Sequence, residues 1–186
     1  MGRTDVSFPY IIVGKSIRYT DGVWDDRTFP ATQTPRFFAD KPDFDTTNVG
    51  YLFPQNDESE VLYITDQMYH RYKQGSNLRP HVHFIQTSAS IPIFELQHRW
   101  YNNGEIVPAF ATMQTTGVGL LPYTSGSMLQ ITPFPEIVGT GKEMSSFFDF
   151  KIYRQTGDGI SGDVLYKGFD FHFKSNGLGS VQEYVK

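Results

Sequence analysis

Three segments of this chain alternate apolar and polar residues with a period of two, and this pattern constrains the fold more than any other feature. In the clearest segment, Phe169, Phe171 and Phe173 are separated by Asp170 and His172. The same alternation runs through Phe94–Trp100 and Ser146–Arg154. Successive side chains of a β-strand point to opposite faces, so each segment is predicted to be a strand with one face in the core and one in solvent.

Shorter apolar runs predict further strands, and glycine-rich turns separate them. These runs are Ile11–Ile17, Glu60–Thr65, His81–Thr87, Val107–Met113 and Met128–Pro133. The 186 residues include 16 Phe, 11 Tyr, 17 Gly and 11 Pro. This composition favours strands that pack rings across a sheet and are joined by frequent turns. We therefore expect one all-β domain over residues 1–186, an antiparallel sandwich or barrel.

Three segments depart from the simple strand pattern. The span from Asp21 to Pro54 is rich in Asp, Thr and Pro, and we expect it to form an extended arm or long loop at approximately residues 21–54. Asn102-Asn103-Gly104 follows a strand directly and predicts a tight hairpin into Ile106–Ala111. Asp66–Gln74 is the one stretch with helical signals, and it is short.

Composition excludes several classes of site and partner. The chain has no cysteine, so it has no disulfide, no thiolate zinc site and no thiol nucleophile. Its 16 Lys and Arg against 20 Asp and Glu give a net charge of -4, without a basic cluster that could neutralise phosphates. No apolar run approaches the roughly 20 residues of a membrane-spanning helix. We expect neither nucleic acid nor a membrane as a partner.

His81 and His83 are the main candidates for a metal site, because alternate residues of a strand project to one face. Enzymes of the cupin type use such a pair, but they follow it closely with a Glu and add a later His. Here the first acidic residue after His83 is Glu95. His172 could supply a third ligand, with Asp170 as its only acidic companion. A cupin-like metal-dependent enzyme stays open as an alternative, while the incomplete motif favours histidines without a metal or cofactor.

No set of residues completes a catalytic motif. Asp25 and Asp26 are adjacent, so on an extended chain their carboxylates point in opposite directions. The segment Gly157–Gly162 spells G-x-G-x-x-G, but no helix follows it to bind a phosphate. We therefore expect no enzymatic activity and no catalytic residue.

Four aromatic residues are candidates for a subunit interface: Trp24, Trp100, Tyr101 and Tyr123. Large rings contribute much of the contact area of protein interfaces. The last three could alternatively form a platform on which sugars stack. Glycan binding is therefore a second possibility for the same residues.

Six groups of short motifs follow one another along the chain. They are Trp24-Asp25-Asp26 with Pro30, Gly75-Ser76, Pro80-His81-Val82-His83-Phe84, Gly139-Thr140-Gly141-Lys142 with Ser145-Ser146, Phe169-Asp170-Phe171-His172-Phe173, and Leu178-Gly179-Ser180 with Glu183-Tyr184-Val185-Lys186. In this order they resemble a family of small virion proteins of tailed bacteriophages. The resemblance covers most of the chain, and its last two groups are the most specific.

The resemblance implies a jelly-roll-like antiparallel β-sandwich located in the virion. It implies a structural role, as a capsid decoration (cement) protein that forms a homotrimer, binds the major capsid protein or another virion protein, and stabilises the particle. A head-fibre or tail component that binds host glycans is the alternative position in the virion. The resemblance implies no catalytic residue and no cofactor.

Overall fold

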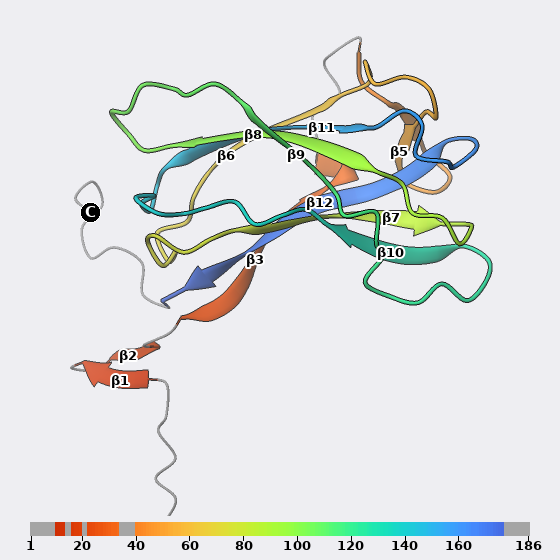
Figure 1. The fold of residues 1–186 in the computed structure, drawn as a ribbon. Coiled ribbons are helices and arrows are strands. Elements are labelled where there is room, and N and C mark those ends of the chain that lie inside the picture. The colour runs from red at the N-terminus through yellow and green to blue at the C-terminus, as the bar shows by residue number, and fades with distance from the viewer. Residues whose placement is uncertain (1–9, 14–15, 20–21, 34–39, 177–186) are drawn as a thin grey trace, which may run out of the picture.

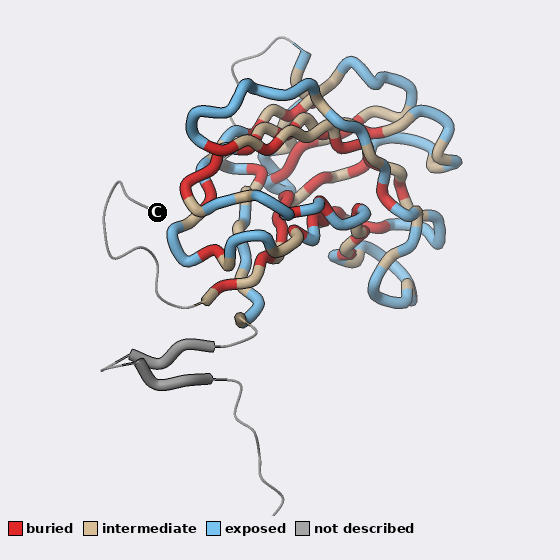
Figure 2. The backbone as a smooth tube through the Cα atoms, turned by 60° about the vertical axis from the view of Figure 1, so that its left-hand side comes forward, coloured by how far each residue is buried: buried red, intermediate tan, exposed pale blue. Residues whose placement is uncertain are grey.

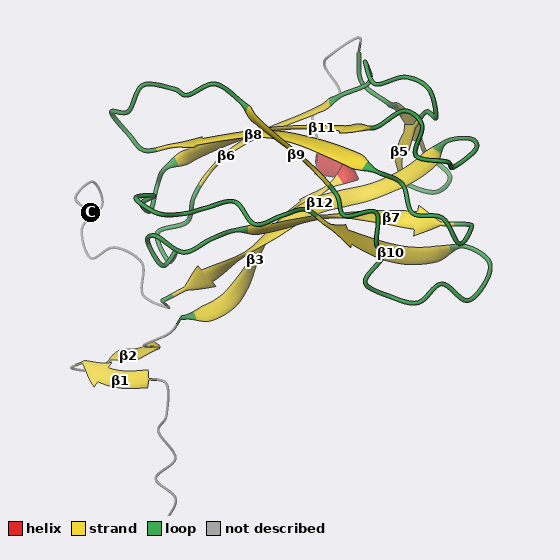
Figure 3. Cartoon of the chain, in the orientation of Figure 1, coloured by secondary structure: helices red, strands yellow, loops and turns green. Residues whose placement is uncertain are grey.

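Two antiparallel β-sheets pack face to face and make up the body of the molecule (Figure 1). The computed structural model describes residues 10–13, 16–19, 22–33 and 40–176. Within these residues the only helix is the short 3-10 turn Ala31–Gln33 (Figure 3). The predicted all-β sandwich is therefore confirmed. None of the described helical residues makes a segment long and apolar enough to span a membrane.

The larger sheet has six strands in the order β10-β7-β12-β5-β4, with β3 also paired to β12. Its strands are β3 (Val23–Pro30), β4 (Asp43–Asp45), β5 (Gly50–Phe53), β7 (Arg79–Gln86), β10 (Met128–Pro133) and β12 (Val164–Ser175). The long strand β12 is central, because β7 lies along one of its sides while β5 and β3 share the other.

The smaller sheet has four strands in the order β6-β11-β8-β9. Its strands are β6 (Leu62–Gln67), β8 (Phe94–Tyr101), β9 (Ala111–Gln114) and β11 (Phe147–Arg154). A separate two-stranded sheet is formed by β1 (Tyr10–Val13) and β2 (Ser16–Tyr19). The three strongly alternating segments thus lie in β8, β11 and the later part of β12, so all three are strands, as predicted.

Aromatic rings fill the space between the two sheets, where the buried residues gather (Figure 2). Phe169, Phe171 and Phe173 of β12 are fully buried. The Phe171 ring lies 5.1 Å from the Phe148 ring and the Phe169 ring lies 5.1 Å from the Phe150 ring, both on β11. Burying such a side chain contributes roughly 1.5–3 kcal/mol, so the alternating segments supply the core that joins the sheets.

The segment predicted as an extended arm or long loop, residues 21–54, instead supplies three strands of the larger sheet. The whole of β3 pairs with β12, and β4 pairs with β5, which itself pairs with β12. The prediction was wrong here because β3 is only half-buried and carries polar residues on its solvent face. Its sequence therefore lacks the apolar alternation that marks the other strands.

Two local predictions were also wrong. The strands β8 and β9 do pair, but β9 begins at Ala111, and the long loop that follows Tyr101 separates it from β8. Gly104 has a φ of 85° and the Glu105 amide donates to the Asn102 carbonyl, so the predicted turn exists without a tight hairpin. Asp66–Gln74 is not helical. Its first two residues complete β6, and the remaining residues form turns and irregular chain.

The glycine motifs of the resemblance pack against each other. A Cβ at Gly139 would lie 1.9 Å from the Ser76 carbonyl oxygen, so only glycine fits there. The Gly75 amide donates to the Lys142 carbonyl, at 3.0 Å. The Gly139 amide donates to Asn77 Oδ1, at 3.1 Å. These motifs hold the loop after β10 against the chain that leads into β7.

Candidate functional site

Strand register brings a carboxylate opposite the two histidines that the sequence singled out. In β7, Val82 and the residues two positions away from it face the core, so His81 and His83 face outward from the larger sheet. In β12 the phenylalanines face the core, so Asp170 faces outward. Because β7 and β12 pair with Asp170 opposite His81, the three polar side chains share one face.

A β-bulge in β12 sets this arrangement. The register of β12 against β7 shifts between Tyr166 and Gly168, which leaves Lys167 as an extra residue. The shift allows Tyr166 and Phe169 both to face the core although three positions separate them. It also places Gly168, which has no side chain, opposite His83, so the carboxylate of β12 can reach that ring diagonally.

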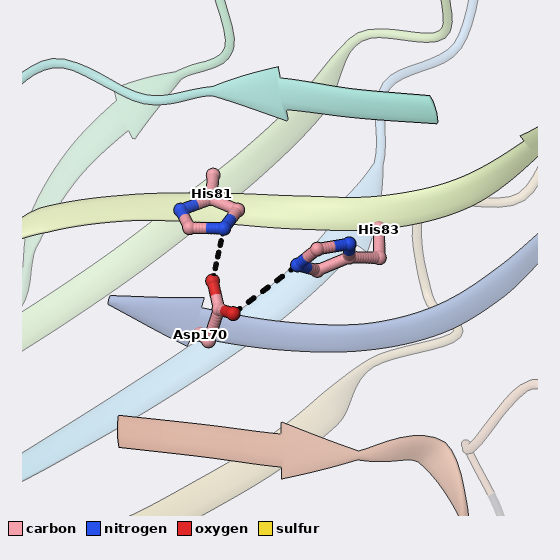
Figure 4. Close-up of side chains that lie close together, drawn as sticks. All are labelled: His81, His83 and Asp170. Atoms are coloured by element: carbon pink, nitrogen blue, oxygen red, sulfur yellow. Dashed lines mark hydrogen bonds and ion pairs between the residues drawn. The ribbon is translucent and has the colours of Figure 1, made fainter. Parts of the chain in front are cut away.

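The carboxylate of Asp170 contacts both histidines (Figure 4). Its Oδ1 atom pairs with His81 Nε2, and its Oδ2 atom lies 3.1 Å from His83 Nε2. The side chains of His81 and Asp170 are 8% and 9% exposed, while that of His83 is 24% exposed. The second ring nitrogen of His81, Nδ1, lies 3.5 Å from the Arg79 carbonyl oxygen.

This environment changes the acidity of the carboxylate. Burial alone raises the pKa of Asp170, but the hydrogen bonds and electrostatic interactions with His81 and His83 outweigh it and lower the pKa to about 2. Asp170 is therefore an anion at neutral pH. A buried anion is stable only where cations or hydrogen-bond donors surround it.

A groove of about 560 Å³ lies over the three residues. Ile131 and Pro133 of β10 stand opposite His83 and His81 and form its apolar wall. The other side is polar, because the His172 ring lies 4.8 Å from the His81 ring and its Nε2 atom is 3.1 Å from Asp26 Oδ1. The groove therefore joins an apolar wall to a cluster of titratable groups.

The three residues offer two imidazole nitrogens and one carboxylate oxygen, and these donor atoms all lie within 4.8 Å of one another. Two histidines and one carboxylate form a common ligand set for divalent transition metals. The same groups could instead act as a hydrogen-bonded cluster that ties β7 to β12. A site inside the sandwich, as in cupins, is ruled out for these residues because aromatic side chains fill that space.

The structure changes the predicted set of metal candidates. It brings His81 and His83 together as predicted, but it directs His172 Nε2 toward Asp26. The third member of the cluster is Asp170, which the sequence suggested only as a companion of His172. The signal that could have found it is its place in the alternation of β12, on the polar face that carries His172.

The four interface candidates do not form one patch. Trp100 is 6% exposed and donates from Nε1 to Ser146 Oγ, so its prediction as an interface or sugar-stacking residue is wrong. Tyr101 stacks on Phe147 at the smaller sheet. The Tyr123 hydroxyl lies within hydrogen-bond distance of two main-chain carbonyls, that of Thr87 after β7 and that of Gly126 in its own loop before β10. Trp24 is 46% exposed on the outer face of the larger sheet, where the Arg79 guanidinium lies 4.3 Å from its ring centroid.

No protein-family model matches the chain, and a search of curated proteins finds none with significant similarity.

Proposed function

We propose that this chain is a structural protein of a bacteriophage virion, a capsid decoration protein that assembles as a homotrimer and binds another virion protein. The observation that carries the proposal is the convergence of three motifs of the resemblance on one surface. They come from β3, β7 and β12, which are distant in sequence and adjacent in the larger sheet.

Individual residues of the three motifs, and not only the strands that carry them, stand next to one another. Asp26 of the first motif pairs in register with His172 of the fifth. His81 of the third motif pairs in register with Asp170 of the fifth. One continuous outer surface therefore carries polar residues from all three motifs, as expected of a surface with a shared role. The last group of motifs, Leu178 to Lys186, lies outside the described residues.

The jelly-roll-like topology that the resemblance implies is supported by the strand order. The order β5-β12-β7-β10 in one sheet faces β6-β11-β8-β9 in the other. From β5 to β12, every connection except that between β8 and β9 crosses from one sheet to the other. Such connectivity is typical of double Greek-key sandwiches, in which viral capsid proteins are well represented.

The apolar wall of the groove continues into a strip that offers a contact surface for a second copy of the chain. We define the β10 strip as Leu120, Leu129, Ile131 and Pro133. Leu120 and Leu129 are 60% and 54% exposed, and the Leu120 amide donates to the Ile131 carbonyl, so the loop extends the edge of the sheet. Exposed apolar surface of this kind marks interaction sites. A cyclic trimer would bury three copies of the strip.

Light scattering on the tag-free chain tests the assembly. The expected mass is three times the 21.2 kDa of the chain. Replacing both exposed leucines of the strip (Leu120→Asp with Leu129→Asp) should give a folded monomer, because it places a charge on the buried surface of each contact. Val138→Asp is the matched control, since Val138 is 66% exposed and lies outside the strip; it should stay trimeric.

A monomer at every concentration of the wild-type chain would contradict the proposed assembly. A trimer that survives the double leucine variant and dissociates in the Val138→Asp variant would contradict the assignment of the β10 strip.

A further inference from the structure

We propose that His81, His83 and Asp170 bind one divalent transition metal ion, with Zn²⁺ as the representative, on the outer face of the larger sheet. The ligand atoms are His81 Nε2, His83 Nε2 and one carboxylate oxygen of Asp170. The remaining coordination position opens into the groove. This inference stands on the side-chain geometry alone and does not depend on the proposed role in a virion.

The positions of the donor atoms carry the proposal. They lie within 4.8 Å of one another, and Zn²⁺ holds nitrogen and oxygen ligands at about 2.0–2.2 Å, so two ligands of one ion lie up to about 4 Å apart. Small side-chain rotations therefore close the site. The two strands that present the ligands are paired in register, so the backbone already holds the three residues together.

The surroundings of His81 resemble the outer shell of a metal site. Metal-bound histidines usually donate their second ring N–H to a carbonyl or carboxylate, which fixes the tautomer that binds the metal. His81 Nδ1 lies 3.5 Å from the Arg79 carbonyl oxygen. A proton on Nδ1 that points to this carbonyl leaves the Nε2 lone pair available, and Nε2 is the atom that faces Asp170.

The donor set selects the class of metal. Imidazole nitrogens suit Zn²⁺, Fe²⁺, Co²⁺ and Ni²⁺, whereas Ca²⁺ requires six to eight oxygen ligands. The site offers two nitrogens and one carboxylate, and the other carboxylates that line the groove, Asp26 and Glu136, pair with His172 and Arg79. A bound dication would also neutralise the buried charge of Asp170. The groove above leaves room for a water molecule or a partner's side chain as a fourth ligand.

Titration of Zn²⁺ into the metal-stripped, tag-free full chain tests the proposal by calorimetry and by thermal unfolding. We expect one ion per chain and an increase in Tm on binding, because the ion binds the folded state. Loss of a residue that only supports a metal ligand lowers metal affinity by about 10–100-fold. His83→Asn and Asp170→Asn each remove a proposed ligand, so each should weaken Zn²⁺ binding by more than that. Co²⁺ bound in the same site should show visible absorption that these variants abolish.

Two variants serve as matched controls. His172→Asn removes an imidazole from the same face that is paired with Asp26 instead. His70→Asn removes an exposed imidazole elsewhere. Both should bind Zn²⁺ within a few-fold of the wild type. The variant His83→Asn keeps the test valid if Asp170→Asn does not fold, because His83 is the most exposed of the three proposed ligands.

Absence of Zn²⁺ and Co²⁺ binding by the folded wild-type chain would overturn the proposal. Binding that survives in folded His83→Asn and is lost in His70→Asn would also overturn it, since the ion would then occupy another site.

Discussion

Asp149 on β11 illustrates how a single carboxylate stabilises the outer face of the smaller sheet. Burial raises its pKa, but hydrogen bonds from Thr65, Arg99 and Tyr101 outweigh this and leave the pKa below its ordinary value. Arg99 Nε donates to Asp149 Oδ2 at 2.6 Å, and the Tyr101 hydroxyl donates to the same atom at 3.2 Å. The ionised carboxylate therefore joins β11 to its neighbour β8.

This arrangement predicts a pH-dependent effect of Asp149→Asn. The pKa is lower in the folded state than the unfolded value of about 3.9, so the carboxylate stabilises the fold above that pH, and the contribution is lost as the pH falls through the folded pKa. We expect the variant to lower the free energy of unfolding by about 2 kcal/mol at pH 7. The difference from wild type should shrink below about pH 4.

Urea unfolding at several pH values between 3 and 7 measures this difference. Asp163→Asn, at an exposed position, is the control and should change the free energy of unfolding little at any pH. A difference between Asp149→Asn and wild type that stays constant or grows on acidification would contradict the role of the ionised carboxylate.

Residue-level prediction from the sequence reached only part of the candidate site. The alternation around Val82 predicts that His81 and His83 share a face, because that inference needs only local geometry. The contact with Asp170 depends on the register between β7 and β12, which are separated by 77 residues or more of chain. No local pattern encodes that register, so the third member of the site became visible only in the folded structure.

At the level of elements, the bulge at Lys167 determines which face of β12 each side chain occupies. Deleting Lys167 would move Phe169 and the residues after it to the opposite face relative to Tyr166. We expect this deletion to abolish cooperative unfolding, because the strand would turn either its phenylalanines or its first residues away from the core. Near-UV circular dichroism during thermal unfolding measures the effect.

Lys167→Ala is the matched control for the deletion. The ammonium group of Lys167 donates to the exposed carbonyls of Asn48 and Val49, so its loss should cost about 1 kcal/mol or less. A deletion variant with the same Tm as Lys167→Ala would show that the extra residue does not set the register.

Strands were predictable where one face is buried and the other is solvated. Phe147–Arg154 is such a strand, and its burial alternates along its length. Val23–Pro30 is not such a strand, because none of its residues is fully buried and half of them are exposed. Its place in the sheet comes from main-chain pairing with β12, and main-chain pairing does not require any particular order of apolar residues.

The predicted tight hairpin after Tyr101 was wrong for a similar reason, because the pairing of β9 is set by β8 and not by the turn residues.

At the level of the whole molecule, the motifs of the resemblance fall into two groups with different physical roles. Gly139 and Ser146 serve the fold, the first by a close backbone approach to Ser76 and the second by accepting a hydrogen bond from Trp100. The motifs on β3, β7 and β12 instead place polar side chains on one outer surface. A stable sandwich without disulfides that presents such a surface suits a component of a symmetric particle.

A cryo-electron microscopy map of the intact particle to which this chain is proposed to belong tests the central claim most directly. The account predicts sandwich-shaped density in three copies around a symmetry axis of the particle, with the β10 strip of each copy against its neighbour and the chain in contact with another virion protein. Purified particles that carry no copy of the chain and show no density for it would contradict the account.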